Sequence, residues 1–339
     1  MSSAVSREGA DWRRAVEPYV GPNARRASFQ MVTTLVPLAL IFWAAHLALS
    51  WSLPLALLLA LPAAGLLVRT FIFMHDCAHG SFFASRRAND IVGFATGVLT
   101  LTPFAQWRRD HALHHASSGD LDRRGHGDVP TLTVREYLAR SPRARLGYRI
   151  IRHPALLLLG GPFHLAIGQR LRGKSTATGT RQISSVWWTN VAIAALLAVG
   201  LVTVGWKTVL VAYALPYYLA AMAGVWLFYV QHQFEDAYWA PHDDWNYVDA
   251  ALRGSSHLRL PAVLQWFTGS IGLHHIHHVQ PRIPFYNLQR CQDAVPAFQA
   301  VPPLTFRRSL DSLRLRLVNE TDRRMVTCAS VKAARGAAR

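Results

Sequence analysis

The chain has 339 residues, of which 51% are hydrophobic and only 16% are charged, and its formal net charge is +17. Soluble domains carry about 25% charged residues, so the composition favours a membrane protein. A nucleic-acid-binding protein can be equally basic, but here the basic residues flank apolar segments, which argues against nucleic acid as a partner. The three cysteines are widely spaced and indicate neither a disulfide framework nor a zinc ribbon.

The sequence divides into a polar N-terminal arm (residues 1–30), an apolar region (31–300) and a basic C-terminal tail (301–339). The arm does not have the pattern of a signal peptide. Four segments of the apolar region approach the ~20 residues needed to cross a bilayer: 31–51, 53–73, 186–204 and 209–229. The joints at residue 52 and at residues 205–207 are very short, which predicts two helical hairpins.

Charge predicts the orientation of these segments. Arginines are concentrated in the arm, in the segment between the hairpins and in the tail, whereas the hairpin tips carry almost no charge besides Lys207. The positive-inside rule therefore predicts that both termini and the middle segment are cytoplasmic. Two shorter apolar segments, 91–104 and 154–167, are predicted to lie at the interface or on the bundle. A crossing by either one is the alternative, and it would break the charge agreement. Arg69 is expected to extend to the lipid headgroups, and the residues from about 327 onward to form a disordered basic tail.

Three histidine clusters lie beside the apolar segments, at residues 75–79, 111–115 and 274–278. Residues three or four apart share one face of a helix, so each cluster can direct its rings to one metal environment. A further histidine ends the last apolar segment; its alternative role is to cap that helix. The candidate ligands are His75, His79, His111, His114, His115, His232, His274, His277 and His278. His275 falls outside this register, and the solitary His46 and His164 are expected to be structural.

Nine neutral imidazoles exceed what one metal ion binds and suit two ions with four or five nitrogen ligands each. An all-imidazole pair with open positions suits iron that binds dioxygen; zinc is the alternative on ligand type, but it prefers four ligands. Carboxylates beside the ligands are expected to orient the rings and to balance charge. The candidates are Asp76, Asp110, Glu235 and Asp236, and for each of them the alternative is a helix cap or a solvated acid.

The motifs HDCAH (75–79), HALHH (111–115) and HHIHH (274–278) resemble the three histidine boxes of the membrane fatty acid desaturases. FYVQHQFED (228–236), WFTGSIG (266–272) and PRIP (281–284) resemble the bacterial branch related to ω-6 (Δ12) acyl desaturases. The resemblance covers most of the chain from about residue 32 to residue 291. It implies an all-α integral membrane fold of four transmembrane helices with a cytoplasmic helical cap, in a bacterial inner membrane.

The resemblance also implies the chemistry. The nine histidines would hold two non-haem irons, and dioxygen would be the co-substrate that introduces a cis double bond into a membrane lipid or an acyl thioester. The electron donor would be a separate protein, a ferredoxin with its reductase, because neither tail contains the HPGG motif of a fused cytochrome b5. Its expected docking face carries Arg86, Arg87, Arg108, Arg109, Arg123 and Arg124. In the animal acyl-CoA branch an asparagine that holds an iron through water stands where this chain has Phe228, so the chain departs from that pattern, and the ninth-ligand geometry and any water ligand are left open.

Two other functions compete with desaturation. A sister di-iron oxygenase, such as a hydroxylase, acetylenase, epoxygenase or carotenoid oxygenase, shares the histidine boxes and differs in how the substrate is placed. A membrane metal transporter would need polar residues along a path through the apolar segments. These segments are nearly free of such residues, which disfavours transport. The sequence leaves open the acyl carrier and the position of the double bond.

Overall fold

The computed structural model describes residues 12–125, 127–171 and 179–337, and it is mostly helical in these segments. Four helical stretches are long and apolar enough to cross a membrane: Ala24–Ala48 (α2), Leu53–His79 (α3), Thr180–Thr203 (α9) and Gly205–His232. The last stretch comprises α10 (Gly205–Thr208), a π-helical segment η3 (Val209–Ala214) and α11 (Leu215–His232). These stretches cover most of the four predicted apolar segments, of which 31–51 and 186–204 run slightly past the ends of α2 and α9, and α3 continues beyond its apolar part through the first histidine box.

Local sequence explains where α3 begins and ends. The Ser52 side chain accepts a hydrogen bond from the Leu55 amide, and Pro54 occupies the first turn, where its missing N–H group costs nothing. The helix ends at Gly80, whose φ of 66° is a left-handed conformation that glycine adopts without strain. His75 and His79 therefore lie in the last turns of a continuous, mostly buried helix.

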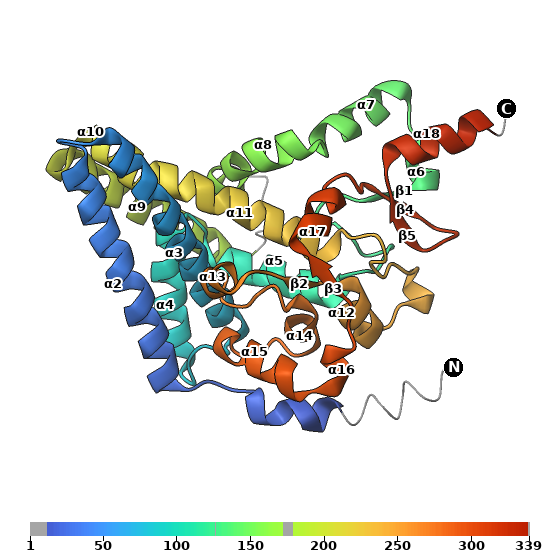
Figure 1. Ribbon diagram of the computed structural model, residues 1–339, viewed down its shortest axis with the longest axis horizontal. Coiled ribbons are helices and arrows are strands. Elements are labelled where there is room, and N and C mark those ends of the chain that lie inside the picture. The colour runs from blue at the N-terminus through green and yellow to red at the C-terminus, as the bar shows by residue number, and fades with distance from the viewer. Residues whose placement is uncertain (1–11, 126, 172–178, 338–339) are drawn as a thin grey trace.

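The end of α2 and helix α10 lie beside each other. The His46 Nδ1 atom, near the end of α2, is 2.9 Å from the Thr208 hydroxyl in α10. Figure 1 shows α10 next to the turn that joins α2 to α3, while α18 (Cys328–Ala337) lies at the far side of the molecule. The contact gives His46 a structural role, as predicted.

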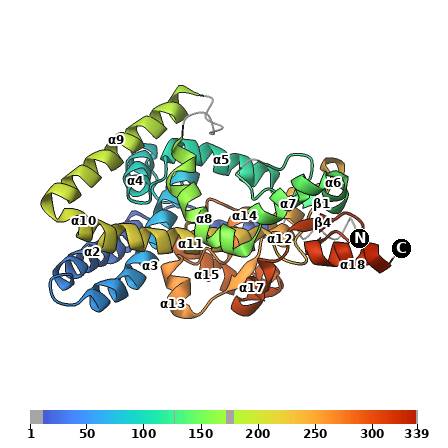
Figure 2. The ribbon, with the colours of Figure 1, turned by 90° about the horizontal axis from the view of Figure 1, so that it is seen from above.

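The segments between the hairpins pack on them. Helix α4 (Arg86–Leu99) lies on α3, and α9 contacts α4 and the start of α5 (Phe104–Ser117), where the Ala105 amide donates to Ser185 Oγ at 3.0 Å (Figure 2). Helices α7 (Pro142–Ile151) and α8 (Pro154–Ala166) are followed by the 3-10 turn η2 (Gly168–Arg170). Together they have the length and composition of a fifth span, bent by 70°. Helix α8 packs along α11, where a Cβ atom on Gly161 would lie 2.8 Å from Val225.

The rest of the chain forms a second region of short elements beyond the ends of α3 and α11 (Figure 1). Its helices are η1 (Glu17–Tyr19), α6 (Val134–Ala139), η4 (His242–Asp244), α12 (Tyr247–Gly254), α13 (Ala262–Phe267), α14 (His274–Val279), α15 (Phe285–Ala294), α16 (Pro296–Gln299), α17 (Phe306–Ser312) and α18 (Cys328–Ala337). Aromatic and aliphatic side chains from α3, α14 and α15 form its core, in which Phe73 stacks on Phe82 with ring centroids 5.3 Å apart.

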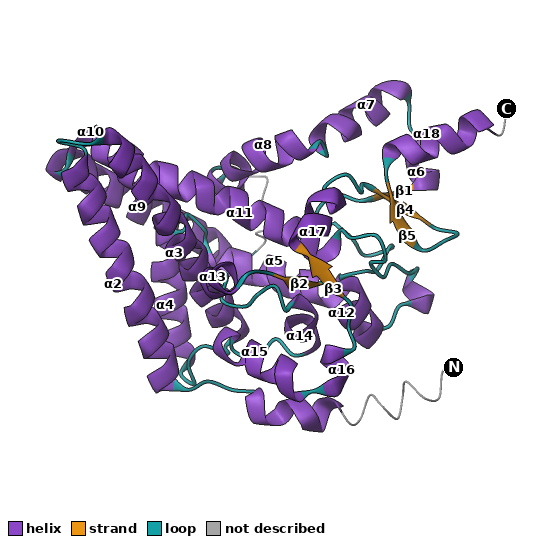
Figure 3. Ribbon diagram, viewed as in Figure 1, coloured by secondary structure: helices purple, strands orange, loops and turns teal. Residues whose placement is uncertain are grey.

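Five short strands modify the all-α expectation (Figure 3). Strand β1 (Leu132–Thr133) pairs parallel with β4 (Leu317–Asn319), which pairs antiparallel with β5 (Arg324–Val326). Strand β2 (His257–Arg259) pairs parallel with β3 (Pro303–Thr305). Strands of two or three residues are too short to show an alternating hydrophobic pattern, so they could not be predicted from the sequence. They attach the C-terminal segment to the rest of the protein, and α18 replaces the disordered tail expected from about residue 327.

The expectation for Arg69 is wrong. Its side chain is only 3% exposed, and it points into the protein rather than to the lipid headgroups. Its Nε atom donates to the Thr34 hydroxyl at 3.1 Å, and its other nitrogens donate to the Gln30 side chain and to the Trp266 carbonyl. The guanidinium also lies 4.3 Å from the centre of the Trp266 ring. Arg69 thus joins α2, α3 and α13.

Candidate metal centre

Four helices bring the histidine clusters together. The first cluster lies at the end of α3, the second in the last turns of α5, and the third forms almost all of α14. His232 is the last residue of α11. Helix α14 is held by long-range bonds: the His274 amide donates to the Ser256 carbonyl at 3.2 Å, and Tyr247 donates to the His278 carbonyl at 2.6 Å.

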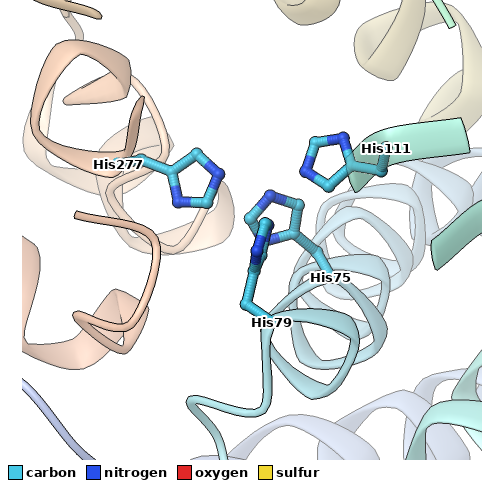
Figure 4. A group of neighbouring side chains, drawn as sticks. All are labelled: His75, His79, His111 and His277. Carbon is cyan, nitrogen blue, oxygen red and sulfur yellow. The ribbon is translucent and has the colours of Figure 1, made fainter. Parts of the chain in front are cut away.

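The first group of candidate ligands consists of His75, His79, His111 and His277. Each residue offers a ring nitrogen, and these nitrogens all lie within 4.8 Å of one another. Figure 4 shows the four rings, which come from α3, α5 and α14, turned toward a common space. A metal ion at this point would have ligands from all three histidine boxes.

The second group consists of His114, His232, His274 and His278, with ligand nitrogens again within 4.8 Å of one another. The Nε2 atom of His232 lies 3.0 Å from Nε2 of His114 and 3.0 Å from Nε2 of His274. The structure therefore places His232 in a ligand group rather than at the surface.

His115 lies between the two groups. Its Nε2 atom is 3.1 Å from Nε2 of His111 and 3.0 Å from Nε2 of His277, which both belong to the first group. Its ring stacks on His278 of the second group, with centroids 4.1 Å apart. All nine candidate ligands thus lie in one continuous cluster of rings.

The protonation pattern of these rings fits bound cations. The Nδ1 atom of His75 faces Asp76, that of His114 faces Asp128, and that of His232 lies 3.1 Å from the Gly254 carbonyl. These acceptors hold the single proton of a neutral imidazole on Nδ1 and leave Nε2 as a lone pair that points into the cluster. Facing lone pairs 3.0 Å apart, as on His114 and His232, repel each other unless a cation lies between them.

Unsatisfied nitrogens support the same conclusion. Among the described residues, the buried Nε2 atoms of His75, His79 and His278 have no hydrogen-bond partner. A buried polar atom without a partner is costly, and a metal ion would supply the missing partner. Metal–imidazole bonds of about 2.1 Å at a right angle would place two nitrogens about 3.0 Å apart, as between His232 and His274.

Burial keeps five of the histidines in α5 and α14 neutral. Burial in the first place, and neighbouring histidines in the second, lower the pKa well below its usual value for five residues: His111, His115, His274, His277 and His278. Only the neutral ring has a lone pair for a metal, so the cluster favours the form that can bind.

The four candidate carboxylates differ in their burial and in their partners. Asp76 is buried between the His75 ring, 3.1 Å away, and the Phe285 amide, which donates to it at 2.7 Å. Asp110 lies on α5 beside His111. Glu235 and Asp236 lie away from the rings: their side chains are 56% and 59% exposed and pair with Arg308 and Arg324.

Asp128, which the sequence analysis did not identify, accepts a hydrogen bond from His114 Nδ1. It is one of three aspartates in the glycine-containing loop after α5, and no spacing connects it to the histidine box. Sequence reasoning could have found it only by considering every acid near the second box.

His275 and Phe228 belong to neither group of candidate ligands. His275 is fully buried outside both groups: its Nε2 atom is 3.1 Å from Gln292 Oε1, and its ring lies 5.2 Å from that of His257. The Phe228 ring lies 5.5 Å from His114 and 6.0 Å from His232, so an apolar side chain borders the second group.

Comparison with known proteins gives a consistent result. Residues 48–308 match the family model described as fatty acid desaturase. The chain is 40% identical over 319 residues to a fatty acid desaturase of Bacillus subtilis, covering 94% of this chain and 90% of the relative. It is 27% identical over 262 residues to the sn-1 acyl-lipid omega-3 desaturase (ferredoxin) of Synechocystis, covering 75% of this chain and 66% of that protein. It is also 27% identical over 236 residues to the chloroplastic omega-6 fatty acid desaturase of Arabidopsis thaliana, covering 66% and 50%.

Proposed function

The chain belongs to the fatty acid desaturase family and is an oxidoreductase, and we propose from this premise that it introduces a cis double bond into an acyl chain of a membrane lipid or acyl thioester, as an ω-6 (Δ12)-like enzyme. Dioxygen is the oxidant in this proposal, and a separate protein supplies the electrons. The observation that carries the proposal is the pair of four-histidine groups, with a ninth ring between them.

We assign two irons to these groups. His75, His79, His111 and His277 would hold one iron, His114, His232, His274 and His278 the other, and His115 lies within reach of both. A di-iron centre supplies the reduction of dioxygen and the oxidation of an unactivated methylene chain, which side chains alone cannot perform.

The protein's own residues bind, orient and shield. Asp76 and Asp128 hold the rings of His75 and His114 in the orientation that leaves Nε2 available. The Trp107 ring stacks on that of His111 with centroids 4.3 Å apart, and this apolar cover helps to exclude water that would quench a reactive oxidant. The acyl chain offers no hydrogen bonds, so the shape of the apolar surroundings selects the carbon that is oxidised.

Two arguments support the ω-6 assignment. The stretches at 228–236 and 266–272 carry the resemblance to that branch, and relatives named as omega-6 desaturases align with the chain. Relatives named as omega-3 desaturases align about equally well, and both names count the position of the new bond from the methyl end of the chain. The proposal therefore commits to a new double bond on the methyl side of an existing one.

We further propose a multi-pass protein of a bacterial inner membrane with four spans and both termini in the cytoplasm. The His46–Thr208 contact supports it, because the two hairpin tips must then be on the same side. A ferredoxin with its reductase is the proposed donor, since two relatives carry ferredoxin in their names. The expected docking face is partly neutralised: Arg108 pairs with Asp90 and Arg124 with Glu136, while Arg86 and Arg87 are exposed.

Lipid analysis tests the reaction. A host that makes only monounsaturated C16 and C18 chains should gain dienoic chains when it expresses this protein with iron and a ferredoxin system. The His79→Ala variant is the control and should give none. Mass spectrometry of derivatised lipids locates the new bond. Hydroxylated chains would instead indicate a sister oxygenase, and monoenes formed from saturated chains would contradict the ω-6 assignment.

A further inference from the structure

Arg152, at the joint between α7 and α8, is 0% exposed and has the largest fully buried side chain in the described part of the protein. An arginine stays protonated in proteins, so its burial must be compensated by hydrogen bonds. The acceptors that surround it are neutral oxygens rather than carboxylates. They belong to Pro130, Thr131, Tyr148, Tyr229, Gln233 and Leu315.

One side of the guanidinium holds the loop that leads away from the second histidine box. Its Nη1 atom donates to the Pro130 carbonyl and to the Thr131 hydroxyl, the latter at 3.3 Å. Pro130 is two residues after Asp128, whose carboxylate accepts the proton of His114 Nδ1. Arg152 therefore fixes the loop that orients one ligand of the second group.

The other side of the guanidinium holds the end of α11. Its Nη2 atom donates to the Tyr229 hydroxyl at 2.9 Å and to Gln233 Oε1 at 2.8 Å. Tyr229 lies three positions before His232 and Gln233 lies one position after it. Arg152 therefore holds the last turn of the helix on both sides of this candidate ligand. Tyr229 itself donates to the Leu315 carbonyl, which adds the C-terminal segment to the same network.

We propose that Arg152 is a positioning residue for the second histidine group: it holds the Asp128 loop and the end of α11 in register, so that His114 and His232 present their Nε2 atoms 3.0 Å apart. The inference rests on the proposed function to the extent that this group is taken to hold iron. The two segments that Arg152 holds lead to Asp128, which orients His114, and to His232, and both of these histidines belong to the second group. We therefore expect the effect of Arg152 to fall on one of the two ions.

The chemistry of arginine suits this task. The guanidinium is planar and directs its N–H groups in fixed directions, so one side chain can hold two segments at a set separation. A lysine ammonium is a point charge on a flexible stem, and it cannot reach the Pro130 carbonyl and the Gln233 side chain in the same way. Arg152→Lys should therefore keep the buried charge but no longer hold the Asp128 loop and the end of α11 at a set separation.

Arg69 provides a matched control. It is also a buried arginine with neutral acceptors, but these lie on Thr34, Gln30 and the Trp266 carbonyl, away from the second group. Arg69→Met should lower stability without any preference between the two ions.

The first test measures iron in purified protein. The full-length protein should contain about two irons per chain, Arg152→Met about one, and Arg152→Lys an intermediate amount. Added variants identify the ion that remains: in the Arg152→Met background, His79→Ala should remove it, whereas His278→Ala should leave it in place. The proposal would be overturned if both Arg152 variants contained two irons. It would also be overturned if His278→Ala removed as much of the remaining iron as His79→Ala in the Arg152→Met background.

The second test needs no metal. Hydrogen exchange of the metal-free protein should show faster exchange at residues 128–131 and 229–233 together in Arg152→Lys, and unchanged exchange there in Arg69→Met. If the unaltered protein binds no iron, the proposed function fails while this measurement still decides the role of Arg152. If it binds two irons and exchange at both segments is unaffected by Arg152→Lys, the role of Arg152 fails alone. Arg152→Lys also decides the question if Arg152→Met does not fold.

Discussion

Asp128→Asn is the substitution that most directly tests how the second histidine group is built. Asparagine keeps the shape of the side chain and removes the negative charge that accepts the His114 Nδ1 proton. Hydrogen bonds to charged groups contribute about 1.5–3 kcal/mol and neutral ones about 0.5–1.5 kcal/mol, so the change should cost about 1–1.5 kcal/mol. Since 1.4 kcal/mol corresponds to about a factor of ten, one of the two irons should bind about tenfold more weakly.

The assay is a competition titration, in which the iron-loaded protein is exposed to increasing chelator and the iron that remains is measured. Asp128→Asn should release one iron at about tenfold lower chelator activity and leave the other unchanged. Asp236→Asn is the matched control: this acid lies closer in sequence to a ligand, but it is exposed and pairs with Arg324, so its loss should leave both irons unaffected. Equal release in Asp128→Asn and the unaltered protein, or weaker binding in Asp236→Asn, would refute the reasoning.

Three further predictions concern the third histidine box, the membrane topology and the stability of the protein at low pH. His275→Ala should retain both irons but lower the free energy of unfolding by about 1–3 kcal/mol, because Gln292 loses its buried partner. His278→Ala should instead lose one iron, and metal analysis together with thermal unfolding distinguishes the two variants. Iron loss in His275→Ala would contradict the assignment of His274, His277 and His278 as the ligands of the third box. Reporter fusions at Ser52 and Gly205 should be active outside the membrane, and inside activity at either would exclude the four-span arrangement. The metal-free protein should lose stability as the pH falls below about 6.5. Buried histidines such as His111 and His277 have lowered pKa values in the folded protein, so they bind protons when the chain unfolds. A melting temperature that does not change between pH 7 and 5 would contradict this prediction.

Local patterns explain what could be predicted from the sequence. The apolar segments are long and continuous, and His75 and His79 are one helical turn apart, so both the helices and the ligand faces can be read from neighbouring residues. The division of the ligands between two groups could not, because His111 joins one group while His114, on the same helix, joins the other. That choice depends on how α5 lies between α3 and α11.

The residues that were missed act through contacts between distant parts of the chain. Arg69, expected to extend to the lipid headgroups, donates to a carbonyl 197 positions later in the sequence. Asp128 and Arg152 lie in loops whose composition resembles that of any surface turn. Glu235, in contrast, was expected near the metals because it follows His232 closely, yet the helix ends between them and the chain turns the carboxylate outward. Closeness in sequence indicates closeness in space only while a regular element continues.

The six residues of α14 have a consequence for how the protein matures in the cell. Both histidine groups take ligands from this helix, and it begins only at residue 274 of 339. A helix of this length is not stable by itself and forms only when it packs against the neighbouring helices. If the two groups hold iron as proposed, neither site can therefore be complete before α14 has been synthesised and has packed against the other helices.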